Sequence, residues 1–250
     1  MVVFLKMSKY FKNCFCFTIL VILAAVFSMW SFCQTNFAEK EIKSLDFSEQ
    51  FKFKIKQPEI IPKFINLDIP FISQAPYAIW DKLHNHACEE AAIIMVYYYL
   101  SGQDLNKEIA EQEILNMVDW QIKNWGGHFD LSAEQIAWLF KDYLDYENVE
   151  LVYNFKIEDI KKELIQGNPI IVPVAGQFLG NPYFTLPGPE YHILVIKGYD
   201  DEKSEWIVND SGTRRGADFR YSYQVLEDSV HDFNDKDILS GGKVMIIIKK

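Results

Sequence analysis

The segment that most constrains the fold is the run 88–100, CEEAAIIMVYYYL, whose apolar residues cover most faces of a helix. Such a helix has to be enclosed by other elements, so we expect it at the centre of a domain. Spacing of apolar residues predicts two amphipathic helices after it, over 106–117 and 132–144. The second of these carries Ser132 and Gln135 in the arrangement of a capping box. The first half of the chain is therefore predicted to be helical.

After Asn148 the pattern changes to alternating and short apolar runs, which are typical of strands. Strands are predicted over 67–72, 149–155, 170–174, 191–199, 205–209 and 244–248, and helices over 157–166 and 221–230. Helices followed by strands predict an α+β domain. We expect the helix that starts at Cys88 to pack on a C-terminal antiparallel sheet.

The first 33 residues have the pattern of an export signal, with three lysines ahead of an apolar run over about 15–32. The run is long for a signal core and close to the lower limit for a spanning helix. Residues 1–38 are thus predicted to be either a cleaved signal peptide or an N-terminal membrane anchor. Residues 39–66 are interpreted as a linker and 67–250 as the domain proper. Both alternatives place that domain outside the cell, secreted or on the outer face of the cytoplasmic membrane.

The charge of the chain argues against binding to nucleic acid. Without residues 1–38 the chain has 22 basic and 35 acidic residues, a net charge of −13. Proteins that bind nucleic acid need a basic surface. The sequence also lacks a glycine-rich phosphate motif and a Gly-x-Ser-x-Gly elbow, and we expect no cofactor.

Cys88 is the candidate nucleophile. The other three cysteines, Cys14, Cys16 and Cys33, lie in the N-terminal stretch, so Cys88 has no disulfide partner in its own domain. A helix start favours the thiolate through its free N–H groups and its dipole. The carboxylates of Glu89-Glu90 oppose this effect unless their side chains point away. The alternative interpretation is an inert buried cysteine.

Three further positions complete a catalytic set. His192 opens a predicted strand, and Asn209-Asp210 ends the next one, so a hairpin would bring either Asp210 or Asn209 beside the imidazole. Gln74 lies in the loop ahead of the cysteine, where an amide can donate to an oxyanion. Each residue alone has a structural explanation, but the order Gln, Cys, His, Asp on these elements favours a nucleophile, a base and an orienting acid.

The remaining histidines are not expected to bind metal. His84, His86 and Cys88 spell H-x-H-x-C, but this spacing is poor for a structural zinc site and no second ligand pair follows. His128 and His231 are predicted to be surface residues. No metal is therefore predicted.

At these residues the chain resembles the cysteine peptidases related to bacteriocin-processing, double-glycine leader peptidases of the papain-like superfamily. The resemblance spans about 67–232. The stretches that carry it are DIPFISQAPYAIWD, ACEEAAIIMVYYYLSG, NPIIVPV, PGPEYHILVIKGYDD and IVNDSGTRRG.

The resemblance implies a papain-like fold with Cys88 as nucleophile, His192 as general base, Asp210 as orienting acid and Gln74 as oxyanion donor. Two departures are present. Asp210 is followed by Ser211 where the family commonly has proline, and Asn209 stays a rival because papain-like relatives use asparagine. Glu89-Glu90 stands where the commoner motif has Gly-Pro.

The function expected from the sequence is hydrolysis of peptide bonds in a peptide or protein substrate. One alternative is an inactive module of the same fold that binds peptides or cell-wall fragments. Another keeps the thiol chemistry but acts as an acyl transferase or an amidase. The N-terminal apolar segment leaves membrane attachment open as a further interaction.

Overall fold

The structure is a computed structural model that describes residues 27–29 and 61–250. Nearly all of the predicted signal or anchor and residues 39–60 of the predicted linker lie outside the described residues. The last part of the predicted linker, 61–66, is described and contains the strand β1, Phe64–Asn66. Within the described residues, no helix is both long enough and apolar enough to span a membrane. Residues 60–250 make up one unit, which contains the whole site described below.

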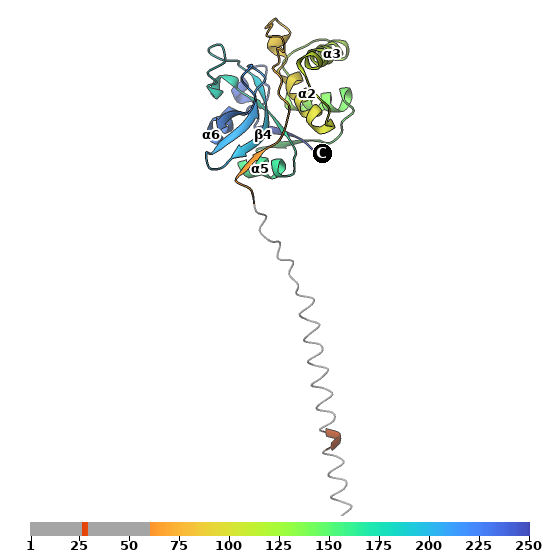
Figure 1. Ribbon diagram of the computed structural model, residues 1–250, viewed down its shortest axis with the longest axis vertical. Coiled ribbons are helices and arrows are strands. Elements are labelled where there is room, and N and C mark those ends of the chain that lie inside the picture. The colour runs from red at the N-terminus through yellow and green to blue at the C-terminus, as the bar shows by residue number, and fades with distance from the viewer. Residues whose placement is uncertain (1–26, 30–60) are drawn as a thin grey trace, which may run out of the picture. The chain divides into compact units, whose positions relative to one another are not determined.

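The helix predicted to be central is α2, Cys88–Ser101, and most of its residues are buried. It ends at Gly102, whose φ of 67° is the left-handed conformation that glycine adopts readily. α3, Lys107–Trp125, packs against α2, and Figure 1 shows both on the same side of the sheet. α4, Ala133–Trp138, begins with the predicted capping box and continues into a short π-helical segment, η2, Leu139–Tyr143.

The described residues form an antiparallel sheet of seven strands, six of which come from the second half of the chain, and this confirms the predicted α+β class. Six of them follow the order β2-β7-β3-β4-β5-β6, and β1 pairs with β4 beside this path. Their bounds are β1 Phe64–Asn66, β2 Val149–Tyr153, β3 Ile170–Val174, β4 His192–Asp200, β5 Glu205–Asn209, β6 Phe219–Ser222 and β7 Val244–Ile248. β3 pairs with the first half of β4, and β1 pairs with its last three residues.

Both faces of β4 are covered, since all nine of its residues are buried. Ile193 and Val195 belong to the core cluster that contains α2 and α3. Leu194 and Ile196 alternate with them and belong to the cluster of the other face. That face is covered by α5, Ile157–Ile165, and α6, Tyr223–Ser229, which lie away from α2 in Figure 1.

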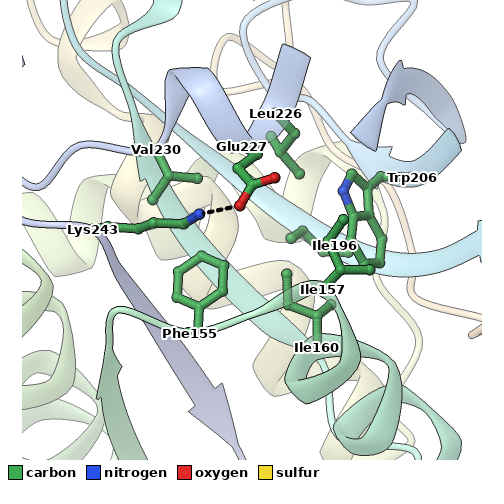
Figure 2. A pocket seen from close by; sticks show the side chains of 9 residues that line it. All are labelled: Phe155, Ile157, Ile160, Ile196, Trp206, Leu226, Glu227, Val230 and Lys243. Carbon is green, nitrogen blue, oxygen red and sulfur yellow. Dashed lines mark hydrogen bonds and ion pairs between the residues drawn. The ribbon is translucent and has the colours of Figure 1, made fainter. Parts of the chain in front are cut away.

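A small apolar cavity lies in the core on the α5 and α6 face (Figure 2). Its walls include Phe155, Ile196 and Trp206. Across one side runs an ion pair of 2.7 Å between Lys243 and Glu227. The cavity volume of about 10 Å³ is room for no more than one water molecule. It is therefore a packing defect of the core and too small for a substrate or a cofactor.

Some predicted bounds were wrong. Residues 67–72 are not a strand, because β1 ends at Asn66 and the chain then leaves the sheet. The predicted helix over 221–230 begins only at Tyr223. Ser222 is its N-cap and accepts a hydrogen bond from Val225 N, while the residues before it pair with β5. α3 runs past the predicted end at residue 117, as far as Trp125.

The close approach of β1 to β4 requires Gly198. A Cβ atom at this position would lie 2.1 Å from the carbonyl oxygen of Ile65. We expect Gly198→Ala to lower the free energy of unfolding by about 1–3 kcal/mol, since backbone has to shift to make room. Gly242→Ala is the control, because a Cβ there meets nothing within 4 Å. Urea denaturation gives both values, and equal midpoints for the two variants would contradict the packing described.

Candidate active site

Cys88 is the first residue of α2 and is only 3% exposed. Ala87 precedes it, and no side chain caps this end of the helix. The N–H groups of the first turn of a helix have no acceptor within the helix, so they are available to a ligand. The structure thus places the thiol at an uncapped helix start, as the sequence predicted.

The thiol of Cys88 donates a hydrogen bond to Glu89 Oε2 at 3.0 Å. Burial, followed by the charge and the hydrogen bond of Glu89, raises the pKa of Cys88 well above its ordinary value. Burial and an adjacent carboxylate therefore outweigh the stabilisation of a thiolate by the helix start, which is the case that the sequence analysis allowed for side chains that do not point away. Glu89 does not point away from the sulfur.

His192 begins β4 and is 2% exposed. Its Nε2 atom lies 2.8 Å from Asp210 Oδ1, and both side chains are buried. With Nε2 held by the carboxylate, Nδ1 is the imidazole nitrogen left to exchange a proton with another group. The pair joins the start of β4 to the residue that follows β5.

Four donors surround the carboxylate of Asp210. Besides His192, Oδ1 accepts from Gly212 N at 3.1 Å, and Oδ2 accepts from Asn181 Nδ2 at 2.9 Å and from the Tyr221 hydroxyl at 2.7 Å. Burial alone would raise the pKa of Asp210, but the charge of His192 and these hydrogen bonds outweigh it and lower the pKa. The carboxylate is thus held ionised without contact to water.

Asn181 and Tyr221 were missed by the sequence analysis. Asn181 lies in an irregular loop, where asparagine is common for its turn conformation. Tyr221 was placed in a predicted helix, whereas it belongs to β6. Only knowledge of which strands are neighbours could have identified either residue.

The imidazole of His192 is wedged between two neighbours. The ring of Phe184 meets it edge to face, with centroids 5.5 Å apart. A Cβ atom at Gly212 would lie 3.0 Å from His192 Cε1, so this residue has to be small. These contacts fix the plane of the ring.

Gln74 and Asn209 make other contacts than the imidazole pair. Gln74 Nε2 donates to the carbonyl of His84 at 2.8 Å, and its Oε1 accepts from the Ser211 hydroxyl at 3.4 Å. A carboxamide carries two N–H donors, so one remains for a further acceptor. Asn209 Nδ2 donates to the carbonyls of Ile69 and Pro70, both at 3.2 Å.

One cleft of about 900 Å³ contains Gln74, Cys88 and His192 in its wall. Its other walls supply aromatic, acidic and basic side chains, namely Trp80, Asp130, Tyr183, Phe184, Glu190, Arg214 and Arg215. This volume is within the range of clefts that hold a small molecule or a few residues of a peptide. The structure thus brings the sequence-predicted thiol, amide and imidazole to the same space.

The histidines considered for metal binding have other partners. His84 Nδ1 lies 2.8 Å from Asp81 Oδ1, and its Nε2 lies 3.3 Å from Glu111. His86 pairs with Asp130 at 3.2 Å. Among the residues that the structure describes, no group of three or more His, Cys, Asp or Glu side chains is arranged to hold a metal ion.

A second buried polar cluster surrounds Glu90, two residues after Cys88 on α2. Glu90 Oε1 accepts a hydrogen bond from Gln121 Nε2 and lies 3.5 Å from His128 Nε2. The side chain of His128 is only 9% exposed, so its prediction as a surface residue was wrong. Burial alone would lower the pKa of His128, but the adjacent carboxylate of Glu90 raises it above its ordinary value of 6.5.

This pair predicts a pH dependence of stability. A pKa that is higher in the folded than in the unfolded protein stabilises the fold below pH 6.5, and the contribution is lost as the pH rises through the folded pKa. We expect the difference in free energy of unfolding between the wild-type protein and His128→Gln to be largest at low pH and to shrink as the pH rises. In a Glu90→Gln background this dependence on pH should disappear. Chemical denaturation at several pH values measures the difference, and a difference between wild type and His128→Gln that does not change with pH would contradict the prediction.

Comparison with known proteins agrees with this arrangement. A sequence model of the Peptidase_C39-like family matches residues 66–235. The crystal structure of a proposed C39-like peptidase from Bacillus anthracis has a TM-score of 0.51 at 17% identity, over 76% of this chain and 99% of that chain. Xylellain, a cysteine protease from Xylella fastidiosa, has a TM-score of 0.41 at 16% identity, over 76% of this chain and 87% of that chain. No curated protein sequence matches the chain.

At 17% identity the likeness to the Bacillus anthracis structure shows a shared fold and nothing finer. The sequence match extends over more than half of the chain and includes Gln74, Cys88, His192 and Asp210. A buried helix that starts at a cysteine and packs on an antiparallel sheet agrees with both findings. The chain therefore belongs to the Peptidase_C39-like family and has a papain-like cysteine peptidase fold.

Proposed function

We propose that this protein hydrolyses peptide bonds, with Cys88 as nucleophile, His192 as general base and Asp210 as the acid that orients the imidazole. The observation that carries the proposal is the buried 2.8 Å contact between His192 and Asp210 at the cleft that also contains Cys88. An imidazole held at Nε2 by a carboxylate has Nδ1 free to accept a proton. A structural histidine would not need to line the same cleft as a lone thiol.

In the proposed mechanism His192 Nδ1 takes the proton of the Cys88 thiol, and the sulfur attacks the carbonyl carbon of the substrate. The oxyanion accepts hydrogen bonds from the Cys88 N–H and from the second N–H of the Gln74 amide. The leaving amine takes the proton back from His192. Water, activated by the same imidazole, then hydrolyses the thioester and restores the thiol.

We propose Asp210 rather than Asn209 as the orienting residue. The Asp210 carboxylate contacts the imidazole directly, whereas the Asn209 amide donates its hydrogen bonds to the carbonyls of Ile69 and Pro70. A charged acceptor also stabilises the imidazolium that forms during the reaction. The hydrogen bonds of Asn209 instead hold Ile69 and Pro70, in the segment that leads to the loop of Gln74.

Export stays a proposal that rests on the sequence of residues 1–38 alone. The lysines and the apolar run predict that the domain lies outside the cell, whether the segment is cleaved or kept as an anchor. Substrates would then be extracellular peptides or proteins.

A second candidate function is a peptide-binding module without catalysis. It is favoured by one observation, the hydrogen bond from the Cys88 thiol to Glu89, together with the raised pKa of the thiol. A thiol kept neutral is a poor nucleophile. The two candidates differ in whether Cys88 forms an acyl-enzyme with a peptide substrate.

Loss of the proposed nucleophile or base should abolish hydrolysis. We expect Cys88→Ala to reduce cleavage of a peptide library to background, and His192→Ala to lower kcat by about 10²–10⁴. Mass spectrometry of the products measures both rates. Cleavage by Cys88→Ala at the wild-type rate would refute the proposal, and absence of cleavage by the wild-type protein with retained peptide binding would favour the binding module.

The orienting role is tested by comparing Asp210→Ala with Asn209→Ala. We expect the first to lower kcat by about 10²–10⁴, because the imidazole loses both its orientation and the charge that stabilises its protonated form. Asp210→Asn should recover part of this loss, since the amide oxygen can still accept from Nε2. Asn209→Ala should lower the melting temperature but not kcat. The reverse pattern would assign the role to Asn209.

A further inference from the structure

Glu89 is the side chain in contact with the sulfur. Its Oε2 accepts the thiol hydrogen bond at 3.0 Å, and Cys88 and Glu89 are 3% and 1% exposed. Among the described residues, no hydrogen bond joins the thiol to His192. In this structure the sulfur is therefore bound by a carboxyl group and not by the proposed base.

The position of the Glu89 carboxyl is fixed from its other oxygen. Oε1 accepts a hydrogen bond from Leu131 N at 2.9 Å. The carbonyl of Leu131 in turn accepts from the Tyr191 hydroxyl at 2.7 Å. The carboxyl thus bridges the start of α2 and the loop ahead of α4, and it cannot swing away from Cys88 without breaking a buried hydrogen bond.

The charged and titratable groups around Glu89 are mostly acidic. Glu90 follows it on α2, Asp130 approaches from the loop, and Tyr191 lies ahead of β4. Two histidines of this region lie against other carboxylates, His86 against Asp130 and His128 against Glu90. Burial, then the charges of Glu90 and Asp130, raise the pKa of Glu89 well above its ordinary value. Its proton therefore exchanges at a higher pH than that of an ordinary carboxyl group.

We propose that Glu89 controls the protonation state of Cys88, an inference that rests on the function proposed above. While Glu89 is ionised, it accepts the thiol hydrogen bond and repels a thiolate, so the sulfur stays neutral. When Glu89 is protonated, its O–H can donate to the thiolate. One proton then moves from Sγ to His192 Nδ1, and the carboxyl group keeps its own. The reactive form of the site is the one with a protonated Glu89.

Glu89→Gln tests this role with little change in shape. The amide oxygen can still accept from Leu131 N, while the amide N–H replaces the repelling oxygen beside the sulfur. Glu90→Gln is the matched control, because it removes a neighbouring buried charge that has no hydrogen bond to the thiol. The measurement is the rate of alkylation by iodoacetamide as a function of pH. It is followed by mass spectrometry on the peptide that contains Cys88, since the full chain has three other cysteines.

We expect Glu89→Gln to lower the pH midpoint of alkylation by at least about one unit, which makes Cys88 about tenfold more reactive at a pH below both midpoints. Glu90→Gln should move the midpoint less. An unchanged midpoint in Glu89→Gln, or equal shifts in the two variants, would overturn the proposal. Alkylation does not require a substrate, so a shifted midpoint in a protein that cleaves no peptide would refute only the proposed hydrolysis.

A measurement on the wild-type protein covers the case in which Glu89→Gln does not fold. Carbon-13 NMR of labelled glutamate follows the carboxyl of Glu89 as the pH changes. We expect its titration midpoint to move when Cys88 is blocked by iodoacetamide, because the thiol donor is lost. The same midpoint before and after blocking would show that the carboxyl and the thiol are not coupled and would overturn the proposal.

Discussion

The buried contact between His192 and Asp210 is the interaction on which the site depends. Pairing of β4 with β5 ends at Val195 opposite Asn209, so His192 and Asp210 both lie beyond the paired part of the two strands. The backbone N–H of Asp210 then donates to Gly216 O, which turns the loop back on itself. The imidazole and the carboxylate lie side by side at this end of the hairpin. Strand register thus decides which residue faces the histidine.

A buried carboxylate is costly unless its charge and its hydrogen-bonding capacity are both satisfied. Asp210 meets this condition through Gly212, Asn181 and Tyr221 in addition to His192. Glu89 is equally buried, but within the part of the chain that the structure describes its carboxyl accepts hydrogen bonds from only the Cys88 thiol and the Leu131 N–H. The same physical rule therefore keeps one carboxyl ionised and favours a proton on the other. Two carboxyl groups with opposite tendencies, one for the base and one for the nucleophile, form the electrostatic basis of the proposed mechanism.

The sequence predicted those parts of the fold that depend on local pattern. The apolar run from Cys88 identified α2, the Ser132 capping box identified the start of α4, and β5 and β7 have the predicted bounds. The sequence did not predict the segments whose secondary structure is set by contacts with distant parts of the chain. β1 is a strand because it pairs with β4, and Tyr221 is part of β6 because β5 lies beside it. At the site, the order of residues along the chain predicted Cys88, His192 and either Asp210 or Asn209 as a set. It could not show that Glu89 would contact the sulfur or that Asn181 would bind Asp210.

The central claim is that Cys88, His192 and Gln74 act on one carbonyl group in the shared cleft. The most direct test is a crystal structure of the protein after reaction with a peptide aldehyde. The account predicts a covalent bond from Cys88 Sγ to the aldehyde carbon, with the resulting oxygen accepting from the Cys88 N–H and from Gln74 Nε2. His192 Nδ1 should lie within hydrogen-bonding distance of the adduct, with Nε2 still bound to Asp210. An aldehyde bound without a bond to sulfur, or an adduct whose oxygen points away from both donors, would contradict the account.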